Sequence, residues 1–385
     1  MPLFLHVLAL AVFAQGTSEF MLSGLVPDLA HDLHVSPAAA AGLTAAYAVG
    51  MIISAPLMAA AGARWPRRPA LAGFLAAFVL VHVLGALTTD FAVLFATRAI
   101  AAVVNAGFLA VALPHAGSLV PAAHRARATA LLLSGVTLAC VVGVPAGALL
   151  GTAYGWRAAF WAVAALCLPA LLLVLRPAPA DHRPPARPAN VSLRRELTAL
   201  RSRPLRATLA IAALVNGATF AGFAFLAVIA TDHTGLPPAA VPGLLAAFGA
   251  GAFLGVTAAG RTTLRLPLAL AALPAGWALT AALGAYPVPL FLLAAAQGAL
   301  SFALGTTLVT RTLHLAPAAP SLSGAFATVA LNTGAFAGPL LAAATTTHTT
   351  TPLTALWTST ALAAAAPACW AATRRMEGAR RGAPH

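Results

Sequence analysis

Charge is scarce in this sequence. Only 8% of its 385 residues are charged, whereas about a quarter is usual for soluble globular proteins, and lysine is absent. The chain is 61% hydrophobic and its mean hydropathy is +0.90, so its polar residues are too few to cover a water-facing surface. The shortage excludes an ordinary soluble domain and indicates a protein whose surface faces lipid.

Acidic residues, cysteines and metal-binding patterns are also few. The chain has eight Asp and Glu residues, and its three cysteines, Cys140, Cys167 and Cys369, stand apart in apolar runs without a Cys-x-x-Cys pair. No His-Glu-x-x-His motif occurs, and histidines such as His82 are isolated, so we expect them to pack and to bond a backbone carbonyl. These absences argue against a metal, a cofactor and a membrane-embedded enzyme, which is the first alternative class.

The basic residues are placed as in a membrane protein. The net charge of +14 comes from 22 basic residues, all of them arginine. They stand mostly in short breaks between apolar runs and form no stripe with interleaved aromatic residues, so no nucleic-acid partner is expected. Arginines in such breaks are typical of cytoplasmic loops, where membrane lipids are their partners.

Apolar runs long enough to cross a bilayer as helices, about 20 residues each, fill most of the chain. Charges, prolines and Gly/Ser/Thr clusters separate about twelve of them, at 3–27, 38–61, 69–88, 91–114, 127–150, 156–175, 207–230, 239–260, 265–285, 288–312, 322–344 and 352–373. The pattern predicts an all-α membrane protein with twelve transmembrane helices.

The breaks alternate in charge, which predicts the orientation. One set of breaks, with the C-terminal tail, carries the arginines Arg64, Arg67, Arg68, Arg125, Arg127, Arg261, Arg265, Arg374, Arg375, Arg380 and Arg381. The other set carries the acids Asp28, Asp32, Asp90 and Asp232, and Arg157 is its main basic exception. The arginine-rich set should be cytoplasmic, so the protein is expected to cross the cell membrane with both termini in the cytoplasm.

The longest polar stretch divides the chain in two. Residues 177–206 are rich in Pro and Arg and predict a cytoplasmic linker, whose "LRRELTALRSR" part forms a basic helix on the membrane surface. The linker separates two expected six-helix bundles, 1–176 and 207–385. "AAAGARWPRRPAL" is echoed by "TAAGRTTLRLPLAL", and "VVGVPAGALLG" by "NTGAFAGPLLAA". These echoes predict two pseudo-symmetric bundles with a transport site between them.

Four motifs carry a resemblance to a known family. They are "GTSEFMLSGLVPDLAHDLHVS" in the first span, "AAAGARWPRRPAL" after the second, "LFATRAIAAVVNAG" in the fourth and "SGVTLACVVGVPAGALLG" in the fifth. With the twelve spans and the central loop, they resemble the major facilitator superfamily, specifically its drug–proton antiporters. The resemblance narrows to the bacterial chloramphenicol (phenicol) exporters through "VFAQGTSEFMLSGL", "VNAGFLAVAL", "GVPAGALLGTAYGWRAAFW" and "LVNGATFAGFAFLA". The resemblance implies a monomer that exports chloramphenicol-like drugs across the inner membrane by alternating access. It implies a proton gradient as the energy source, no cofactor, and antibiotic resistance as the result.

The resemblance also assigns roles to residues. Arg98 occupies the place of a membrane-embedded arginine of the substrate and proton site, and the fifth span carries residues expected in packing and gating, namely Gly143, Pro145, Gly147 and Gly151. The loop after the second span keeps three arginines expected in gating, namely Arg64, Arg67 and Arg68. Ala63 replaces the usual acid of that loop, and a purely topological role for these arginines is the alternative.

Glu19 is the only acid well inside a predicted span. A carboxyl group tolerates a low-dielectric site far better when it is neutral, so such a group can take up a proton on one side and release it on the other. Glu19 is therefore the first candidate for proton coupling, and Asp28, in a Pro-Asp turn at the outer helix end, is the second. The structural alternatives are a bond from Glu19 to a neighbouring helix and a permanent salt bridge to Arg98.

Few other polar side chains lie inside the spans. Six of them are candidates for binding a small polar aromatic drug: Gln15, Tyr47, Asn105, Asn216, Gln297 and Asn332. Asn105 follows Arg98 by two helical turns and shares its face. Each could instead bond another helix without touching a ligand.

Two rival transport functions remain open at this point. The chain would export another solute, such as a sugar, nucleoside or amino acid, or act as a passive uniporter in which Glu19 need not titrate. The sparse polar lining favours an apolar drug over a sugar.

Overall fold

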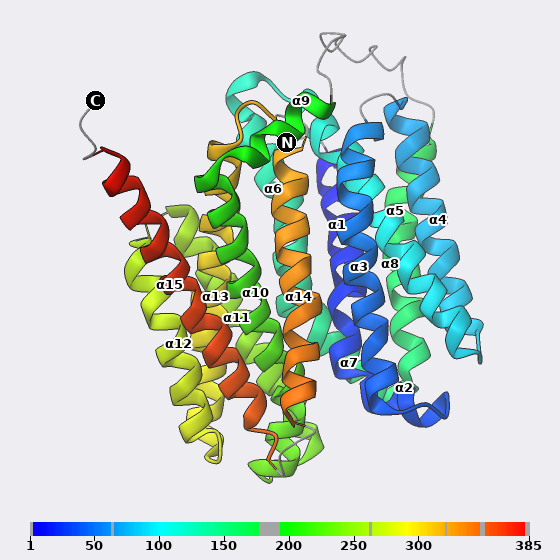
Figure 1. The fold of residues 1–385 in the computed structure, drawn as a ribbon. Coiled ribbons are helices and arrows are strands. Elements are labelled where there is room, and N and C mark those ends of the chain that lie inside the picture. The colour runs from blue at the N-terminus through cyan, green and yellow to red at the C-terminus, as the bar shows by residue number, and fades with distance from the viewer. Residues whose placement is uncertain are drawn as a thin grey trace. The chain divides into compact units, whose positions relative to one another are not determined.

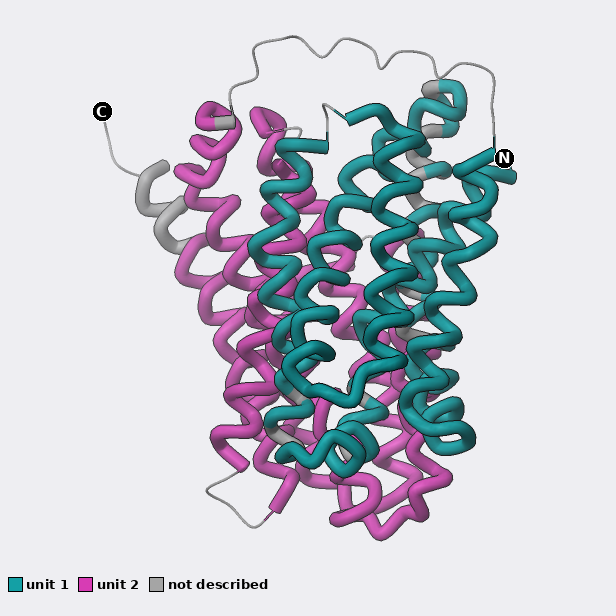
Figure 2. Tube along the Cα trace, turned by 90° about the vertical axis from the view of Figure 1, so that its right-hand side faces the viewer, with its two compact units in different colours: residues 1–191 teal, residues 192–385 magenta. Residues whose placement is uncertain are grey.

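The computed structural model describes residues 3–62, 65–176, 193–261, 264–319, 322–346 and 351–381. These residues form helices joined by short connections, and no β-strand occurs among them. The chain divides into two compact units, residues 1–191 and 192–385, and each is a bundle of long helices (Figure 2). The division falls inside the stretch expected as the linker.

The described part of the first unit contains eight α-helices with short 3₁₀ and π segments between them (Figure 1). In chain order they are α1 (Leu3–Phe20), η1 (Met21–Gly24), α2 (Val26–Asp32), α3 (Pro37–Ala61), α4 (Arg67–Leu87), α5 (Phe91–Ser118), η3 (Ala122–His124), α6 (Arg125–Leu138), η4 (Ala139–Gly143), α7 (Val144–Tyr154) and α8 (Trp156–Leu175).

The second unit is built in the same way. Its elements are α9 (Leu193–Leu197), η5 (Thr198–Arg201), α10 (Arg203–Val228), η6 (Ile229–His233), η7 (Pro238–Ala240), α11 (Val241–Arg261), α12 (Leu266–Leu283), α13 (Pro287–Leu315), α14 (Ser323–Thr346) and α15 (Thr354–Arg381).

Local sequence signals set several helix ends. Asp90 caps α5 by accepting hydrogen bonds from the backbone N–H groups of Ala92 (2.7 Å) and Val93 (3.1 Å). Gly155, between α7 and α8, has a φ of 80°, a left-handed conformation that glycine adopts without steric cost. The reversal at Gly155 brings α8 back along α7.

Ten helices of the described part are long and apolar enough to cross a membrane, against the twelve spans predicted. The predicted fifth span is helical, but the π segment η4 divides it into α6, of 14 residues, and α7, of 11 residues. The predicted twelfth span is the 28-residue helix α15, whose sequence is rich in Ala and Thr and ends in arginines. These two helices complete the set of twelve.

The two units pair their helices in the same way. In the first unit the closest pairs join α3 to α5, α4 to α8, α4 to α5, α1 to α6 and α1 to α8. In the second unit the corresponding pairs join α11 to α13, α12 to α15, α12 to α13, α10 to α14 and α10 to α15. Equivalent spans therefore pack on equivalent partners, as the sequence echoes predicted.

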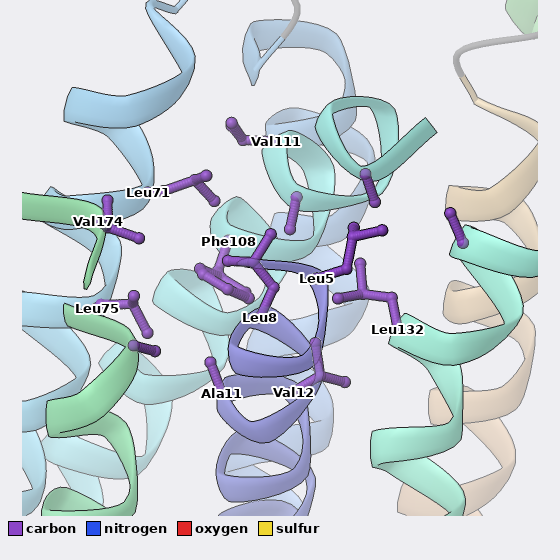
Figure 3. Packing of buried hydrophobic residues seen from close by; sticks show 14 residues of the cluster. Leu5, Leu8, Ala11, Val12, Leu71, Leu75, Phe108, Val111, Leu132 and Val174 are labelled. Atoms are coloured by element: carbon purple, nitrogen blue, oxygen red, sulfur yellow. The ribbon is translucent and has the colours of Figure 1, made fainter. Parts of the chain in front are cut away.

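A buried apolar cluster holds α1 in the first unit (Figure 3). Leu5, Leu8 and Val12 of α1 pack with side chains of α4, α5, α6 and α8, among them Phe108 and Leu132, and all five are at most 1% exposed. This packing fixes the rotation of α1 about its axis, because the stripe formed by Leu5, Leu8 and Val12 must face the cluster. The polar residues that follow on the same helix are thereby placed.

The described part of the expected linker packs against the second unit. A short helix, α9, is followed by the 3₁₀ turn η5, and α10 begins at Arg203, four residues earlier than the predicted span at 207–230. Glu196 is buried and accepts a hydrogen bond of 2.9 Å from the backbone N–H of Leu322, just before α14. The segment expected as one basic surface helix is therefore a short α-helix followed by a 3₁₀ turn, and Glu196 ties it to the start of α14.

Candidate functional site

Arg98 is the centre of a polar cluster inside the first unit. Its side chain is only 1% exposed, and its guanidinium donates two hydrogen bonds to Ser18 of α1: Nη1 to the hydroxyl oxygen (2.8 Å) and Nη2 to the backbone carbonyl (2.6 Å). Because both bonds come from a cation, they are stronger than bonds between neutral groups. They fasten α5 to α1 at the point where the sequence placed the embedded charge.

Aromatic rings lie against the same guanidinium. Its central carbon is 4.8 Å from the centre of the Tyr47 ring and 5.9 Å from that of Phe160. The Tyr47 hydroxyl accepts a hydrogen bond of 2.8 Å from the Asn105 amide, which also lies 3.9 Å from the sulfur of Met51. Tyr47, Arg98 and Asn105 are thus brought together, with Asn105 holding the ring that faces Arg98.

Glu19 follows Ser18 at the end of α1, and its side chain is partly exposed. Its charge acts on Arg98, but no direct ion pair joins the two residues; the one ion pair among the described residues is that of Arg157 with Asp32. The alternative of a permanent Glu19–Arg98 salt bridge is therefore not what this structure contains. Arg98 is held by Ser18, and Glu19 lies near enough for its charge to act on this fixed cation.

Gln15 precedes Glu19 by about one turn of α1 and is completely buried. Neither its amide oxygen nor its amide nitrogen has a hydrogen-bond partner in the described part of the chain. The Nε of Arg98 and the hydroxyl of Thr17 lack partners in the same way. Buried polar groups are nearly always bonded, so unmet hydrogen-bonding capacity is concentrated at this end of α1.

Sequence reasoning missed Ser18 and gave His82 only part of its role. His82 of α4 contacts the carbonyl of Phe78 (2.7 Å through Nδ1), which confirms the expected bond to the backbone. Its other ring nitrogen lies 2.6 Å from the Ser18 hydroxyl. The position of Ser18 next to Glu19 was the only sequence signal for its role. The partners of Ser18, His82 and Arg98, are too distant in the sequence to be recognised from it.

The acids at the other end of this unit behave differently from one another. Asp28, the second candidate for proton coupling, is exposed on α2. Asp32, which the sequence did not single out, accepts hydrogen bonds from Arg157 and from the indole nitrogen of Trp156 (3.0 Å). The bond from Arg157, followed by that from Trp156, holds the pKa of Asp32 below its usual range. Arg157, the basic exception in the acidic set of breaks, is therefore paired with an acid.

The glycines of the fifth span face the first span. Gly143 lies against Thr17, Gly147 against Met21 and Gly151 against Leu25, and a side chain at Gly147 would meet the Met21 Cβ at 3.0 Å. Pro145, which stands between them in the chain, is buried. These residues bring α7 into close contact with the helix end that carries Glu19.

The arginines of the loop between α3 and α4 make local contacts where they are described. Arg67 donates a hydrogen bond of 2.6 Å to the hydroxyl of Ser118, which joins the start of α4 to the end of α5. The guanidinium carbon of Arg68 lies 5.9 Å from the centre of the Phe4 ring. Arg64 lies outside the described residues.

The three candidates of the second unit bond backbone carbonyls. Asn216 of α10 donates to the carbonyl of Leu331 in α14 (2.7 Å), and Asn332 donates to Thr328 of its own helix (3.0 Å). Gln297 of α13 is 3.4 Å from the carbonyl of Leu273 in α12. These amides are not joined to one another by hydrogen bonds, and Asn216 and Gln297 make the bonds between helices that were the alternative to ligand contact.

No group of three or more His, Cys, Asp or Glu side chains with the arrangement of a metal site occurs among the described residues. The polar cluster around Arg98 therefore consists of one cation, one nearby carboxylate, and neutral hydroxyl, amide, imidazole and phenol groups. Such a set can hold a proton and hydrogen-bond a small molecule.

Comparison with known proteins gives the family. Residues 8–339 match the family described as Major Facilitator Superfamily. The chain is 54% identical to a protein of Streptomyces lividans named "Chloramphenicol resistance protein", over 95% of each chain. It is 32% identical to a "Chloramphenicol efflux pump" of Mycobacterium tuberculosis (strain CDC 1551 / Oshkosh), over 68% of this chain and 63% of the relative.

A solved structure shares the fold. The structure is that of a bacterial homologue of the human lysosomal transporter Spinster, in an inward-facing and occupied conformation. The two chains align with a TM-score of 0.71 at 17% identity, over 96% of each chain. These similarities confirm the predicted resemblance and the predicted fold class. By its matched residues, its relatives and its repeated helix pairing, this multi-pass membrane protein belongs to the Major Facilitator Superfamily of transporters.

Proposed function

We propose that the protein exports chloramphenicol-like drugs in exchange for protons, by alternating access, and thereby confers antibiotic resistance. The observation that carries this proposal is the 54% identity, over 95% of both chains, to a protein named "Chloramphenicol resistance protein". The relative named "Chloramphenicol efflux pump" supports the direction of transport.

Glu19 is the proposed proton carrier. It is partly exposed, its charge acts on Arg98, and no direct ion pair among the described residues locks it in the ionised form. A proton that binds Glu19 removes the negative charge near Arg98, and its release restores that charge. The change in local charge alters the balance between the two access states.

The unbonded polar groups near Glu19 are the proposed drug contacts. Chloramphenicol is a neutral aromatic molecule with hydroxyl and amide groups, which both donate and accept hydrogen bonds. Gln15 offers an amide whose oxygen and nitrogen are both unbonded, and the Nε of Arg98 offers a further donor. The ring of Tyr47, held by Asn105, offers an aromatic surface. Asn216, Gln297 and Asn332 are also proposed to contact the drug; in that case drug binding must share or replace the bonds that their amides make to backbone carbonyls.

The proton gradient suffices to drive this exchange without a cofactor. One proton that moves inward releases about 2.3 kcal/mol per 100 mV of membrane potential and about 1.4 kcal/mol per unit of pH difference. Together these support a concentration ratio of several hundredfold for a neutral drug, since 1.4 kcal/mol corresponds to about a factor of ten.

We further propose that the protein works as a monomer in the inner membrane, with both termini in the cytoplasm. The monomeric state is what the family resemblance implies. The basis for the orientation is the alternation of arginine-rich and acidic breaks, in which Arg157 is the main exception. Arg157 forms an ion pair with Asp32, so its charge is balanced and argues less against this orientation. A reporter active only in the cytoplasm, fused after His385, should be active.

The decisive experiment measures chloramphenicol accumulation in energised cells that express the wild type or Glu19→Gln. We expect low accumulation with the wild type and high accumulation with Glu19→Gln, because glutamine keeps the size of the side chain but cannot carry a proton. Asp90→Asn is the matched control, since asparagine retains the helix cap that Asp90 provides for α5. Asp28→Asn tests the second candidate in the same way.

Three results would contradict parts of the proposal. Equal accumulation in empty cells and wild-type cells rejects chloramphenicol as the substrate and favours export of another solute, such as a sugar, nucleoside or amino acid. Export that persists in Glu19→Gln rejects Glu19 as the carrier. Unchanged equilibration of the drug after an uncoupler is added indicates a passive uniporter.

A further inference from the structure

A chain of hydrogen bonds runs from Arg98 through Ser18 and His82 to the backbone of α4. The Nη1 of Arg98 contacts the Ser18 hydroxyl at 2.8 Å, the same hydroxyl lies 2.6 Å from Nε2 of His82, and Nδ1 of His82 lies 2.7 Å from the carbonyl of Phe78. Arg98 and His82 are each 1% exposed and Ser18 is fully buried. The chain joins α5, α1 and α4 within one unit.

The direction of every bond follows from its two ends. A guanidinium can only donate, so the Ser18 oxygen accepts from Arg98; a carbonyl can only accept, so Nδ1 of His82 carries a proton and donates to Phe78. The Ser18 hydroxyl then has one proton to give, and Nε2 of His82 is the acceptor beside it. A neutral imidazole with its proton on Nδ1 satisfies all three bonds and adds no second cation beside Arg98.

We propose that His82 is a positioning residue that acts through Ser18 to fix the guanidinium of Arg98. The Ser18 hydroxyl rotates freely about its C–O bond unless a partner takes its proton. By accepting that proton, His82 turns the lone pairs of the oxygen toward Arg98. Ser18 directly precedes Glu19, so the same bonds set the place of the arginine charge relative to the carboxylate. The effect of this positioning on drug export rests on the function proposed above.

Two other roles predict different behaviour of His82. If the ring only filled space, a phenylalanine would replace it well, because His82 packs 4.2 Å from the Phe78 ring centre and 5.8 Å from that of Phe160. If His82 carried the transported proton, no side chain that cannot titrate would replace it. The positioning role requires only a hydrogen-bond acceptor at the place of Nε2.

A spectroscopic test does not depend on any transport substrate. The purified full-length protein is labelled with ¹⁵N in its histidines, and the His82 signals are assigned by their loss in His82→Gln. We expect a proton on Nδ1, an unprotonated Nε2 that accepts a hydrogen bond, and a shift of the Nε2 signal in Ser18→Ala but not in Ser18→Thr, which keeps the hydroxyl. A proton on Nε2, or an Nε2 signal that ignores Ser18→Ala, overturns the proposal.

A transport test then measures the consequence in reconstituted vesicles at equal protein content. Glutamine places an amide oxygen near the position of Nε2, whereas asparagine is too short to reach Ser18, and phenylalanine keeps the ring without an acceptor. We expect His82→Gln to keep most of the chloramphenicol transport rate, and His82→Asn and His82→Phe to lose about tenfold or more, as when a hydrogen bond to a charged network is broken.

The outcomes separate this proposal from the one on which it rests. Full activity of His82→Phe, or a loss in His82→Gln as large as in His82→Phe, overturns the positioning role. Wild-type vesicles that move no chloramphenicol reject the proposed substrate. In that case the ¹⁵N spectra, which need no substrate, by themselves decide the role of His82.

Discussion

Arg98 provides the most direct test of how the buried charge is used, through the substitution Arg98→Lys. Lysine keeps the positive charge, but its ammonium lacks the planar fork with which the guanidinium reaches both oxygens of Ser18 while it lies 4.8 Å from the Tyr47 ring centre. We therefore expect the variant to insert and fold but to transport poorly.

The size of the loss follows from the contacts. A hydrogen bond to a charged group contributes about 1.5–3 kcal/mol, and the replacement sacrifices at least one of the two bonds from Arg98 to Ser18. Part of the cation–π contact with Tyr47, about 2 kcal/mol when desolvated, is retained by the ammonium. The loss of one bond lowers the transport rate about 10- to 150-fold, since 1.4 kcal/mol is a factor of ten.

The assay is the initial rate of chloramphenicol-dependent proton movement in inverted membrane vesicles, normalised to the amount of transporter in the membrane. Arg261→Lys is the control, because Arg261 is exposed at the end of α11. A wild-type rate in Arg98→Lys would refute the reasoning: it would mean that the charge alone suffices and that the fork to Ser18 has no part in transport.

Two further predictions concern stability. The bond from Arg157 lowers the pKa of Asp32 below its usual value of about 4. Ionised Asp32 therefore stabilises the fold fully above about pH 4, and this stabilisation is lost as the pH falls through the lowered pKa. Asp32→Asn should therefore lower the melting temperature at pH 7, with a loss of unfolding free energy below about 1 kcal/mol for this partly exposed pair, and the difference from the wild type should shrink as the pH falls through the lowered pKa. A difference that does not change as the pH falls contradicts the assignment. Gly255→Ala should destabilise the second unit by about 1–3 kcal/mol, because the new Cβ would lie far closer to the Ala299 carbonyl oxygen than van der Waals contact allows. Gly260→Ala on the same helix is the control, since its Cβ would meet open space. Thermal unfolding in detergent compares the two, and equal stabilities would show that α11 and α13 separate without cost.

Much of this protein could be predicted from its sequence, because lipid imposes simple rules. A span must be apolar and about 20 residues long, so the helices could be counted and roughly bounded. A charge inside a span is costly, so Glu19 and Arg98 stood out from the apolar background. Where the rule is weaker, the prediction was less complete: the fifth predicted span is divided by a π segment, and α15 is less apolar than the other spans.

The partners of the charges depended on the tertiary structure. Ser18 lies 64 positions from His82 and 80 from Arg98, and only the packing of α1 against α4 and α5 brings the three together. The same packing commits Asn105 to Tyr47 and Asn216 to a backbone carbonyl, although each amide looked equally available in the sequence. A sequence shows which side chains need a polar partner, since that need is a property of the residue in lipid. Which partner meets it depends on distances between helices, and only the fold determines those.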